Sequence, residues 1–216
     1  LNILGMDSRN ILIMIDGQPI TGKFYDRVSL DYISTGNVDK IEITKGPSSS
    51  LYGSDAMAGV VNIITNSNID KSYLNLDLNY SLPEEAANSV GLTDGSKKYK
   101  LSGLKQLGNL LISINTNIDQ ISTDKLIKES DIDEITKYSF NSFLQWKLNN
   151  FNTIKFRNRL YQHYENGISS LIDTKTTIKQ NNVSLNHNLN INKDWTFNHI
   201  FQRQTYSRNY FEKWNV

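Results

Sequence analysis

The sequence predicts two regions with different folds: a compact mixed α/β region, followed by a longer region of antiparallel strands. Up to residue 66, short apolar runs end at turns that contain Gly or Pro, as in a small domain with buried strands. After residue 66, long segments alternate between apolar and polar residues and are joined by polar connections. We therefore expect one domain at residues 1–66 and a second domain, of about seven strands, at residues 71–216.

Two strands of the first region are expected from their residue patterns. The run Ile11–Ile15 is wholly apolar and ends at Asp16 and Gly17, which predicts a strand buried on both faces and then a turn. Residues 40–45 alternate and end at Gly46-Pro47, which predicts a half-buried strand that stops abruptly.

A helical turn and a third strand complete the first region. Serines 48–50 offer hydroxyl groups that can cap a short helical turn around Leu51 and Tyr52. Residues 59–65 predict the third strand, and Gly53 and Gly59 bracket the tight segment between this turn and that strand. The first region is therefore expected to be a small mixed sheet with short helices.

The second region begins with a clear alternation. From residue 74 to residue 82 every even position is apolar and every odd position is polar, so the strand has one apolar and one polar face. Phe143 breaks the pattern in a later segment, in which Tyr138, Phe140, Leu144, Trp146 and Leu148 share one face. The further segments predicted as strands are 97–106, 110–119, 137–148, 153–164, 176–191 and 195–206.

The connections between these strands alternate in length. Those near 107–109, 149–152 and 192–194 are short, whereas those near 83–96, 120–136 and 165–175 are long. Tight turns on one side and long loops on the other are typical of an up-and-down transmembrane β-barrel, whose strands need about 9–11 residues to cross the bilayer. The alternative is a soluble antiparallel sheet, although its strands are usually only about 5–6 residues long.

Composition excludes several classes of protein. The net charge is +1 and 21% of the residues are charged, so no strong field attracts nucleic acid. The chain has no cysteine, and its three histidines, His163, His187 and His199, are widely spaced, so we expect no metal site and no cofactor. No apolar run approaches the ~20 residues of a transmembrane helix, and the mean hydropathy is −0.46.

Three blocks of the first region resemble the plug domain of TonB-dependent outer-membrane receptors. Residues 10–19 resemble the plug pattern VLVLIDGxP, residues 38–47 resemble IERIEVxRGP, and residues 49–65 resemble SxLYGSxAxGGVINIIT. The blocks occur in the order and spacing of that family. The matched motif residues are Asp16, Gly17, Glu42, Lys45, Gly46, Pro47, Tyr52, Gly53, Gly59 and Asn62.

This resemblance implies a fold and a function. The chain would hold the C-terminal part of a plug and the first strands of a barrel of about 22 strands in the outer membrane of a Gram-negative-type bacterium. The whole protein would bind a ferric siderophore, cobalamin or haem and import it with energy relayed by TonB. Its partners would be this metal chelate or cobalamin-like ligand, TonB and outer-membrane lipid.

The resemblance also nominates ligand contacts. In the family, the segment between the first two blocks rises to an apex where ligands rest. Here that segment offers aromatic stacking faces, positive charge and a hydroxyl group, from the residues Thr21, Lys23, Phe24, Tyr25 and Arg27. The alternative is an ordinary polar loop whose aromatic side chains pack on neighbouring residues.

Two departures from the family pattern concern charge. In the family, the acid and the base that match Glu42 and Lys45 belong to a charged cluster between plug and barrel, and the resemblance implies the same role here. The alternative is that Glu42 forms only an exposed ion pair. Lys45 replaces the usual Arg and lacks its bidentate fork. Leu4 stands where an Arg that faces the ligand is usual in some siderophore receptors.

The sequence also bears on functions other than nutrient uptake. The chain has no G-x-x-x-x-G-K phosphate loop and no G-x-S-x-G elbow, so we do not expect an enzyme. A receptor for sensing or polymer import, and an adhesion barrel, remain alternatives. Leu1 is not an initiator Met, and seven strands cannot close around a plug, so we expect this chain to be a piece of a longer protein. The TonB-binding segment would then precede this piece. The isolated piece would expose the edges of its sheet.

Overall fold

The computed structural model describes residues 2–3, 5–7, 10–20, 23–24, 27–28, 38–65, 72–81, 95–122, 134–168, 171–192 and 195–215. The chain divides into two compact units, Leu1–Ile69 and Asp70–Val216, and each unit is described by itself. In the described part of the chain, no helix has the length and apolar character needed to span a membrane.

The first unit is built on a four-stranded mixed sheet with the strand order β4-β3-β8-β7. Strands β3 and β8 run parallel, whereas the other neighbours are antiparallel. The short helices α1 (Ser49–Tyr52) and η4 (Ser54–Ala56) connect β7 to β8. The strands of the first unit are β1 (Asn2–Ile3), β2 (Met6–Asp7), β3 (Ile11–Ile15), β4 (Gln18–Pro19), β5 (Lys23–Phe24), β6 (Arg27–Val28), β7 (Val38–Lys45) and β8 (Gly59–Thr65).

Strand β3 forms the centre of this unit, and its predicted burial on both faces is confirmed. On one face, Ile11, Ile13 and Ile15 pack with Val61 and Ile63 of β8, among other apolar side chains. On the other face, a second cluster contains Leu12, Met14, Ala56 and Val60. Burying one such aliphatic side chain stabilises a fold by about 1.5–3 kcal/mol, so the two clusters hold β3 in place.

Strand β7 differs from the prediction of a half-buried strand. It lies at the edge of the sheet and pairs with β8, and its apolar side chains Ile41 and Ile43 are 58% and 55% exposed. The prediction was wrong because alternation shows that a strand has two unlike faces, but not whether anything covers the apolar one.

The helical turn at α1 begins at the backbone of Ser48. The carbonyl oxygen of Ser48 accepts hydrogen bonds from the backbone N–H groups of Leu51 and Tyr52, each at 3.1 Å. The hydroxyl group of Ser48 instead donates to the carbonyl oxygen of Gly46 at 3.4 Å. Ser48 therefore secures the chain reversal after β7, and its hydroxyl group does not cap the helix.

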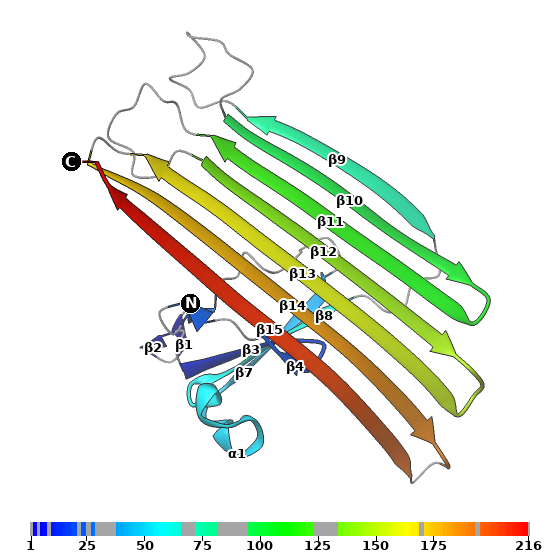
Figure 1. Cartoon of the computed structure of the whole chain (residues 1–216). Helices are drawn as coiled ribbons and strands as arrows, with labels where there is room; N and C mark the ends of the chain where they lie inside the picture. The colour runs from blue at the N-terminus through cyan, green and yellow to red at the C-terminus, as the bar shows by residue number, and fades with distance from the viewer. Residues whose placement is uncertain are drawn as a thin grey trace. The chain divides into compact units, whose positions relative to one another are not determined.

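The second unit is a seven-stranded antiparallel sheet in which each strand pairs with its neighbours in sequence, as Figure 1 shows. Every segment predicted as a strand is one, although most strands extend beyond the predicted ends. The strands are β9 (Tyr73–Ser81), β10 (Gly95–Leu107), β11 (Leu110–Ser122), β12 (Glu134–Lys147), β13 (Asn152–Ile168), β14 (Ile172–Asn190) and β15 (Thr196–Trp214).

The connections partly follow the prediction. The three short turns, after β10, β12 and β14, gather at one end of the sheet (Figure 1). The long connections expected near 83–96 and 120–136 fall mainly on residues outside the described ranges. The long connection expected at 165–175 was wrong, because β13 continues to Ile168 and pairs there with Asp173 of β14.

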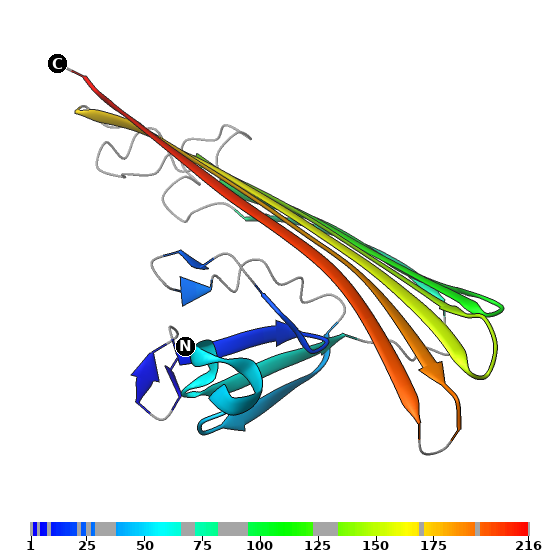
Figure 2. The same cartoon turned by 60° about the horizontal axis from the view of Figure 1, so that its bottom comes forward.

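Strand length increases across the sheet, from 9 residues in β9 to 19 residues in β14 and β15. Figure 2 shows that these long strands curve along their length. Strands of soluble proteins are usually about 5–6 residues long, and a tilted strand crosses a bilayer in about 9–11 residues. Every strand of the second unit is therefore long enough to cross a membrane.

Candidate functional site

The strand register of the second unit defines two faces, because residues paired across antiparallel strands lie on the same face. One continuous row runs across five strands and is wholly apolar. Its members are paired in turn from β11 to β15: Ile112, Leu144, Phe156, Leu185 and Phe201. Three of them, Leu144, Leu185 and Phe201, are exposed. This side of the sheet is called the apolar face below.

The opposite side, called the polar face below, carries a matching polar row. Its members are paired in turn from β10 to β15: Ser102, Asn115, Asn141, Arg159, Asn182 and Gln204. Ser102, Asn115 and Asn182 in this row are buried. Burial and polarity are thus reversed relative to a sheet that folds in water, where the apolar face is buried.

Phe143 is the apolar residue that breaks the alternation in β12, and the structure gives a reason for it. Phe143 is buried on the polar face directly opposite Arg157 of β13. The guanidinium carbon of Arg157 lies 4.6 Å from the centre of the Phe143 ring, within the range of a cation–π contact. The aromatic ring therefore supports a buried positive charge on this face.

A chain of hydrogen bonds follows the polar face of β13. The Tyr161 hydroxyl oxygen lies 3.3 Å from Nδ1 of His163, and Nε2 of His163 lies 3.0 Å from Oε2 of Glu165. The three residues are two positions apart, so their side chains point to the same side of the strand. These side chains thus form hydrogen bonds with one another within the polar face.

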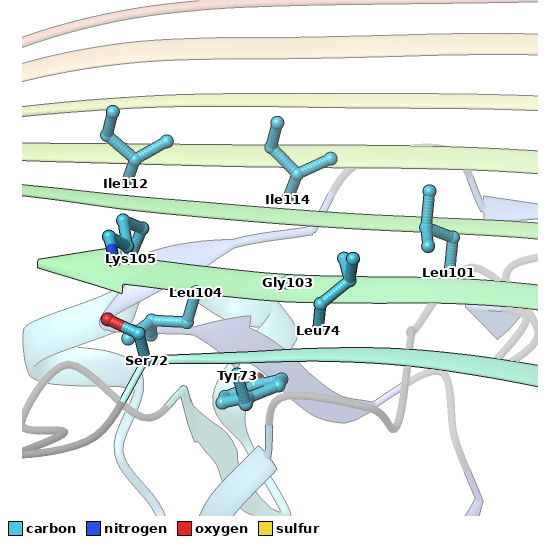
Figure 3. A pocket seen from close by; sticks show the side chains of 9 residues that line it. All are labelled: Ser72, Tyr73, Leu74, Leu101, Gly103, Leu104, Lys105, Ile112 and Ile114. Atoms are coloured by element: carbon cyan, nitrogen blue, oxygen red, sulfur yellow. The ribbon is translucent and has the colours of Figure 1, made fainter.

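A groove of about 490 Å³ lies on the second unit over Gly103, at the β9 edge of the sheet (Figure 3). Its apolar lining includes Leu74, Leu101, Ile112 and Ile114, and Gly103 leaves the space that a side chain would fill. Because little of this lining is polar, the groove suits a hydrocarbon chain better than a charged nutrient.

In the first unit, Asn62 links residues from all three motif blocks. The backbone N–H of Gly17 donates to Oδ1 of Asn62 at 2.9 Å. Asn62 is also the cross-strand partner of Glu42. Lys40 has the largest effect in lowering the pKa of Glu42, and a hydrogen bond to the side chain of Asn62 adds to it. The turn at Asp16 and Gly17, whose φ values of 50° and 76° suit a tight hairpin, is thereby tied to strand β7.

The charges of β7 are arranged as an exposed pair. Nζ of Lys40 lies 2.7 Å from Oε1 of Glu42, and about half of each side chain is exposed. The hydrogen bond to Lys40, and then the charge of Lys40, hold the pKa of Glu42 below its usual value, and the same two interactions with Glu42 raise the pKa of Lys40. Strand alternation places Lys45 on the opposite face of β7 from Glu42.

The motif glycines and Pro47 shape the passage from β7 to β8. Gly46 has a φ of 106°, and its N–H donates to the carbonyl oxygen of Ala58 at 3.1 Å. A Cβ atom at Gly59, where φ is 147°, would overlap the carbonyl oxygen of Thr44. Gly53 also has positive φ, and Pro47 precedes helix α1, where Tyr52 is exposed. These residues therefore act as scaffold.

The predicted ligand contacts are only partly described. Lys23 and Phe24 form β5 and Arg27 belongs to β6, and the register sets Phe24 opposite Arg27 in a small hairpin. Thr21, Tyr25 and Leu4 lie outside the described residues. The role of this segment in ligand binding stays a prediction.

The structure brings together two histidines that are widely spaced in the sequence. His187 of β14 pairs directly with His199 of β15, and their ring centres are 5.5 Å apart. Their equal distance from the turn between the two strands is the sequence signal that could have revealed this contact. Within the described ranges, no group of three or more His, Cys, Asp or Glu residues is arranged to hold a metal ion.

Comparison with known proteins gives a consistent result. Residues 1–60 match the family model described as TonB-dependent Receptor Plug Domain. The vitamin B12 transporter BtuB of Vibrio vulnificus (strain CMCP6) is 42% identical over 65 residues, which cover 30% of this chain and 11% of BtuB. The ferric enterobactin receptor of Pseudomonas aeruginosa is 31% identical over 97 residues, which cover 40% of this chain and 13% of that receptor.

Solved structures show the same fold in both units. The siderophore receptor PirA from Pseudomonas aeruginosa aligns with a TM-score of 0.73 and 20% identity, over 99% of this chain and 37% of PirA. The siderophore receptor PiuA from Acinetobacter baumannii aligns with a TM-score of 0.66 and 14% identity, over 97% of this chain and 30% of PiuA. The chain thus spans well under half the length of these relatives. Its first 60 residues thus match the plug domain of TonB-dependent receptors, and the chain has the fold of the siderophore receptors with which it aligns.

Proposed function

We propose that the protein takes up a scarce nutrient across the outer membrane with energy supplied through TonB. In this proposal residues 1–66 are the C-terminal part of the plug, and residues 71–216 are the first seven strands of the barrel wall. The observation that carries it is the reversed sheet of the second unit, which follows a plug-family sequence.

The reversed sheet supports a membrane position on energetic grounds. Each Å² of apolar surface left in water forfeits about 25 cal/mol of burial free energy. The apolar face leaves several large side chains uncovered, Phe201 at 68% exposure among them. Lipid removes this cost, and the polar face then lines the barrel interior, as in outer-membrane barrels.

The nutrient we propose is a ferric siderophore or a cobalamin-like compound, and haem is a further member of the same class. The support comes from the relatives, which include a vitamin B12 transporter and a ferric enterobactin receptor. We propose that the segment with Thr21, Lys23, Phe24, Tyr25 and Arg27 contacts this ligand, because aromatic faces and positive charge suit bulky anionic chelates.

Uptake by the full-length receptor tests the proposed function. A bacterial strain that lacks its own receptors would express the protein and be supplied with labelled ferric enterobactin or labelled cyanocobalamin. We expect accumulation of one of them, and we expect that accumulation to stop when TonB is deleted or the proton-motive force is collapsed. Surface expression without uptake of any siderophore, cobalamin or haem would contradict transport and favour a sensing or adhesion barrel.

The ligand contacts are tested separately by binding. Phe24→Ala and Arg27→Gln should weaken the binding of the imported ligand to receptor in detergent, because each removes a stacking face or a charge. Lys105→Gln is the matched control, since it removes a positive charge at the apolar groove of the second unit. Equal affinities of all these variants would show that the segment is an ordinary loop, even if uptake itself is confirmed.

A further inference from the structure

We propose that His187 and His199 form a binding site for a divalent first-row transition-metal ion on the apolar face of β14 and β15. The site goes beyond nutrient uptake and does not depend on it. The two residues are direct cross-strand partners, and their rings lie 5.5 Å apart between centres with a 58° angle between planes. The sheet register therefore holds two imidazoles side by side.

The spacing of the rings fits two ligands on one ion. Zinc–nitrogen bonds are about 2.0–2.1 Å long, so two imidazoles on one tetrahedral zinc have ring centres roughly 5 Å apart. The observed distance of 5.5 Å between the ring centres is close to that value. Directly opposed residues in an antiparallel pair have Cβ atoms about 4.5–5.5 Å apart, so the backbone already supplies the proximity.

Hydrogen bonds that begin at the neighbouring turn orient the ring of His187. Oδ1 of Asn149 accepts from the backbone N–H of Phe151 at 2.9 Å and from that of Asn152 at 2.8 Å. The same oxygen accepts from Nδ2 of Asn152 at 3.1 Å. Because the amide nitrogen of Asn152 is engaged there, its Oδ1 is the atom that faces His187.

This orientation determines which nitrogen of His187 can bind a metal. Oδ1 of Asn152 lies 3.1 Å from Nε2 of His187, and an amide oxygen only accepts hydrogen bonds. Nε2 therefore carries the proton, and Nδ1 carries the lone pair. Histidines that ligate metals usually donate their other N–H to a carbonyl or carboxylate oxygen, so Asn152 has the position of such a supporting residue.

The surroundings leave room for an ion and its remaining ligands. His199 is exposed and His187 is half-buried. Both lie close to the turn between β14 and β15, near Trp195 and Phe197 at the start of β15. In the proposed membrane position, this end of the strands lies near the boundary with water, so water can complete the coordination shell. Imidazole nitrogen suits Cu²⁺, Ni²⁺ and Zn²⁺, with Cu²⁺ bound most tightly, and it does not suit Mg²⁺.

The test is a Cu²⁺ titration of the full, tag-free protein in detergent micelles, followed by electron paramagnetic resonance. We expect one Cu²⁺ per chain with two coupled nitrogen nuclei, and no competition from Mg²⁺. His187→Gln and His199→Gln should each lose one nitrogen coupling and the tight binding. Asn152→Ala should keep both nitrogen nuclei but weaken binding about 10–100-fold.

His163→Gln is the matched control, because His163 lies on the polar face and contacts Tyr161 and Glu165. It should bind Cu²⁺ like the wild type. The proposal is overturned if the wild type binds no Cu²⁺, or if the double variant of His187 and His199 binds it unchanged. Asn152→Ala keeps both histidines, so it tests the site even where a histidine variant does not fold, and unchanged affinity would count against the proposal.

Discussion

The two sheets of this chain differ in the side chains that they bury. Among the residues that the structure describes, the largest fully buried side chains are Ile11 and Ile13 in the first unit but only Ser113 and Ser184 in the second. Phe201, in the apolar row of the second unit, is 68% exposed. Side chains alternate between the two faces of a strand in both units. In the first unit the buried positions of the central strand are apolar, whereas in the second unit the apolar row is largely exposed.

We propose that this difference reflects what surrounds each sheet. Apolar side chains move inward only when water lies outside, because the free-energy gain comes from leaving water. A sheet that keeps polar residues on its buried face and apolar residues on its exposed face is arranged for an apolar solvent. In the proposed function, the first unit is therefore surrounded by water and the apolar face of the second unit by lipid.

The largest effect is expected from one glycine substitution in the first unit. In Gly59→Ala, the new Cβ atom would overlap the carbonyl oxygen of Thr44 and the residue would be held at a φ of 147°. Overlap and backbone strain each cost about 1–3 kcal/mol, so we expect a loss of roughly 2–6 kcal/mol. Hydrogen exchange of the β7 and β8 amides measures it, and undiminished protection would contradict the close packing.

Gly103→Ala is the matched change in the second unit. There the new Cβ atom would lie 3.2 Å from Cδ1 of Leu74, the movable end of a side chain. We expect a loss of less than about 1 kcal/mol, because Leu74 can shift outward over the groove. A loss as large as that of Gly59→Ala would mean that the groove is more rigid than the structure indicates.

The next largest effect separates the two faces of β12. Leu144→Arg places a charge on the apolar face and should destabilise insertion into lipid vesicles by about 2–4 kcal/mol. Gln145→Arg places the same charge on the polar face and should cost much less. Urea unfolding of receptor in vesicles measures both, and equal losses for the two variants would remove the basis for assigning the apolar face to lipid.

A smaller effect is expected at the junction of the plug blocks. Asn62→Ala removes the acceptor for the Gly17 N–H and the contact with Glu42, and it should destabilise the first unit by about 1 kcal/mol. The protection of the Ile15 to Gln18 turn against hydrogen exchange should fall most. If protection falls equally throughout both units, the side chain of Asn62 does not specifically join the turn at Gly17 to strand β7.

The smallest effect is expected from the exposed pair on β7. Because the folded-state pKa of Glu42 is lowered, its pairing stabilises the fold at neutral pH and is lost as the pH falls through that lowered value. The raised pKa of Lys40 has the opposite consequence, since its contribution is lost as the pH rises through the alkaline range. Glu42→Gln should therefore destabilise the fold slightly at pH 7 and low salt, and not at acidic pH or at high salt. Denaturant titrations of this variant at acidic and neutral pH measure the difference. A large loss that persists at high salt would show that Glu42 belongs to a buried cluster.

The sequence predicts the strands and turns better than it predicts which strands are buried. Strand β3 and its turn followed from local residue order, because an apolar run that ends at Asp-Gly admits few alternatives. The half-buried state predicted for β7 was wrong, since coverage depends on neighbours far away in the sequence. The loop predicted at 165–175 was wrong because the polar residues there pair across β13 and β14.

The pairing of His187 with His199 shows the same limit. Eleven residues separate the two histidines along the chain, and only the register of the hairpin brings the two rings together. The plug motif residues could be named in advance, but the hydrogen bonds that join them at Asn62 required the fold. Residue identity thus predicted the scaffold, and strand pairing determined the contacts.

The most direct test of the central claim, that the second unit faces lipid with its apolar side, is a spin-label scan of β12. Labels would be placed singly from Tyr138 to Lys147 in receptor reconstituted into vesicles, and their collision rates with oxygen and with a water-soluble nickel complex would be compared. The structure predicts high oxygen accessibility at Tyr138, Phe140, Leu144 and the other even positions, and low accessibility at the odd ones. A scan without this two-residue period, or one in which the nickel complex reaches the even positions, would contradict it.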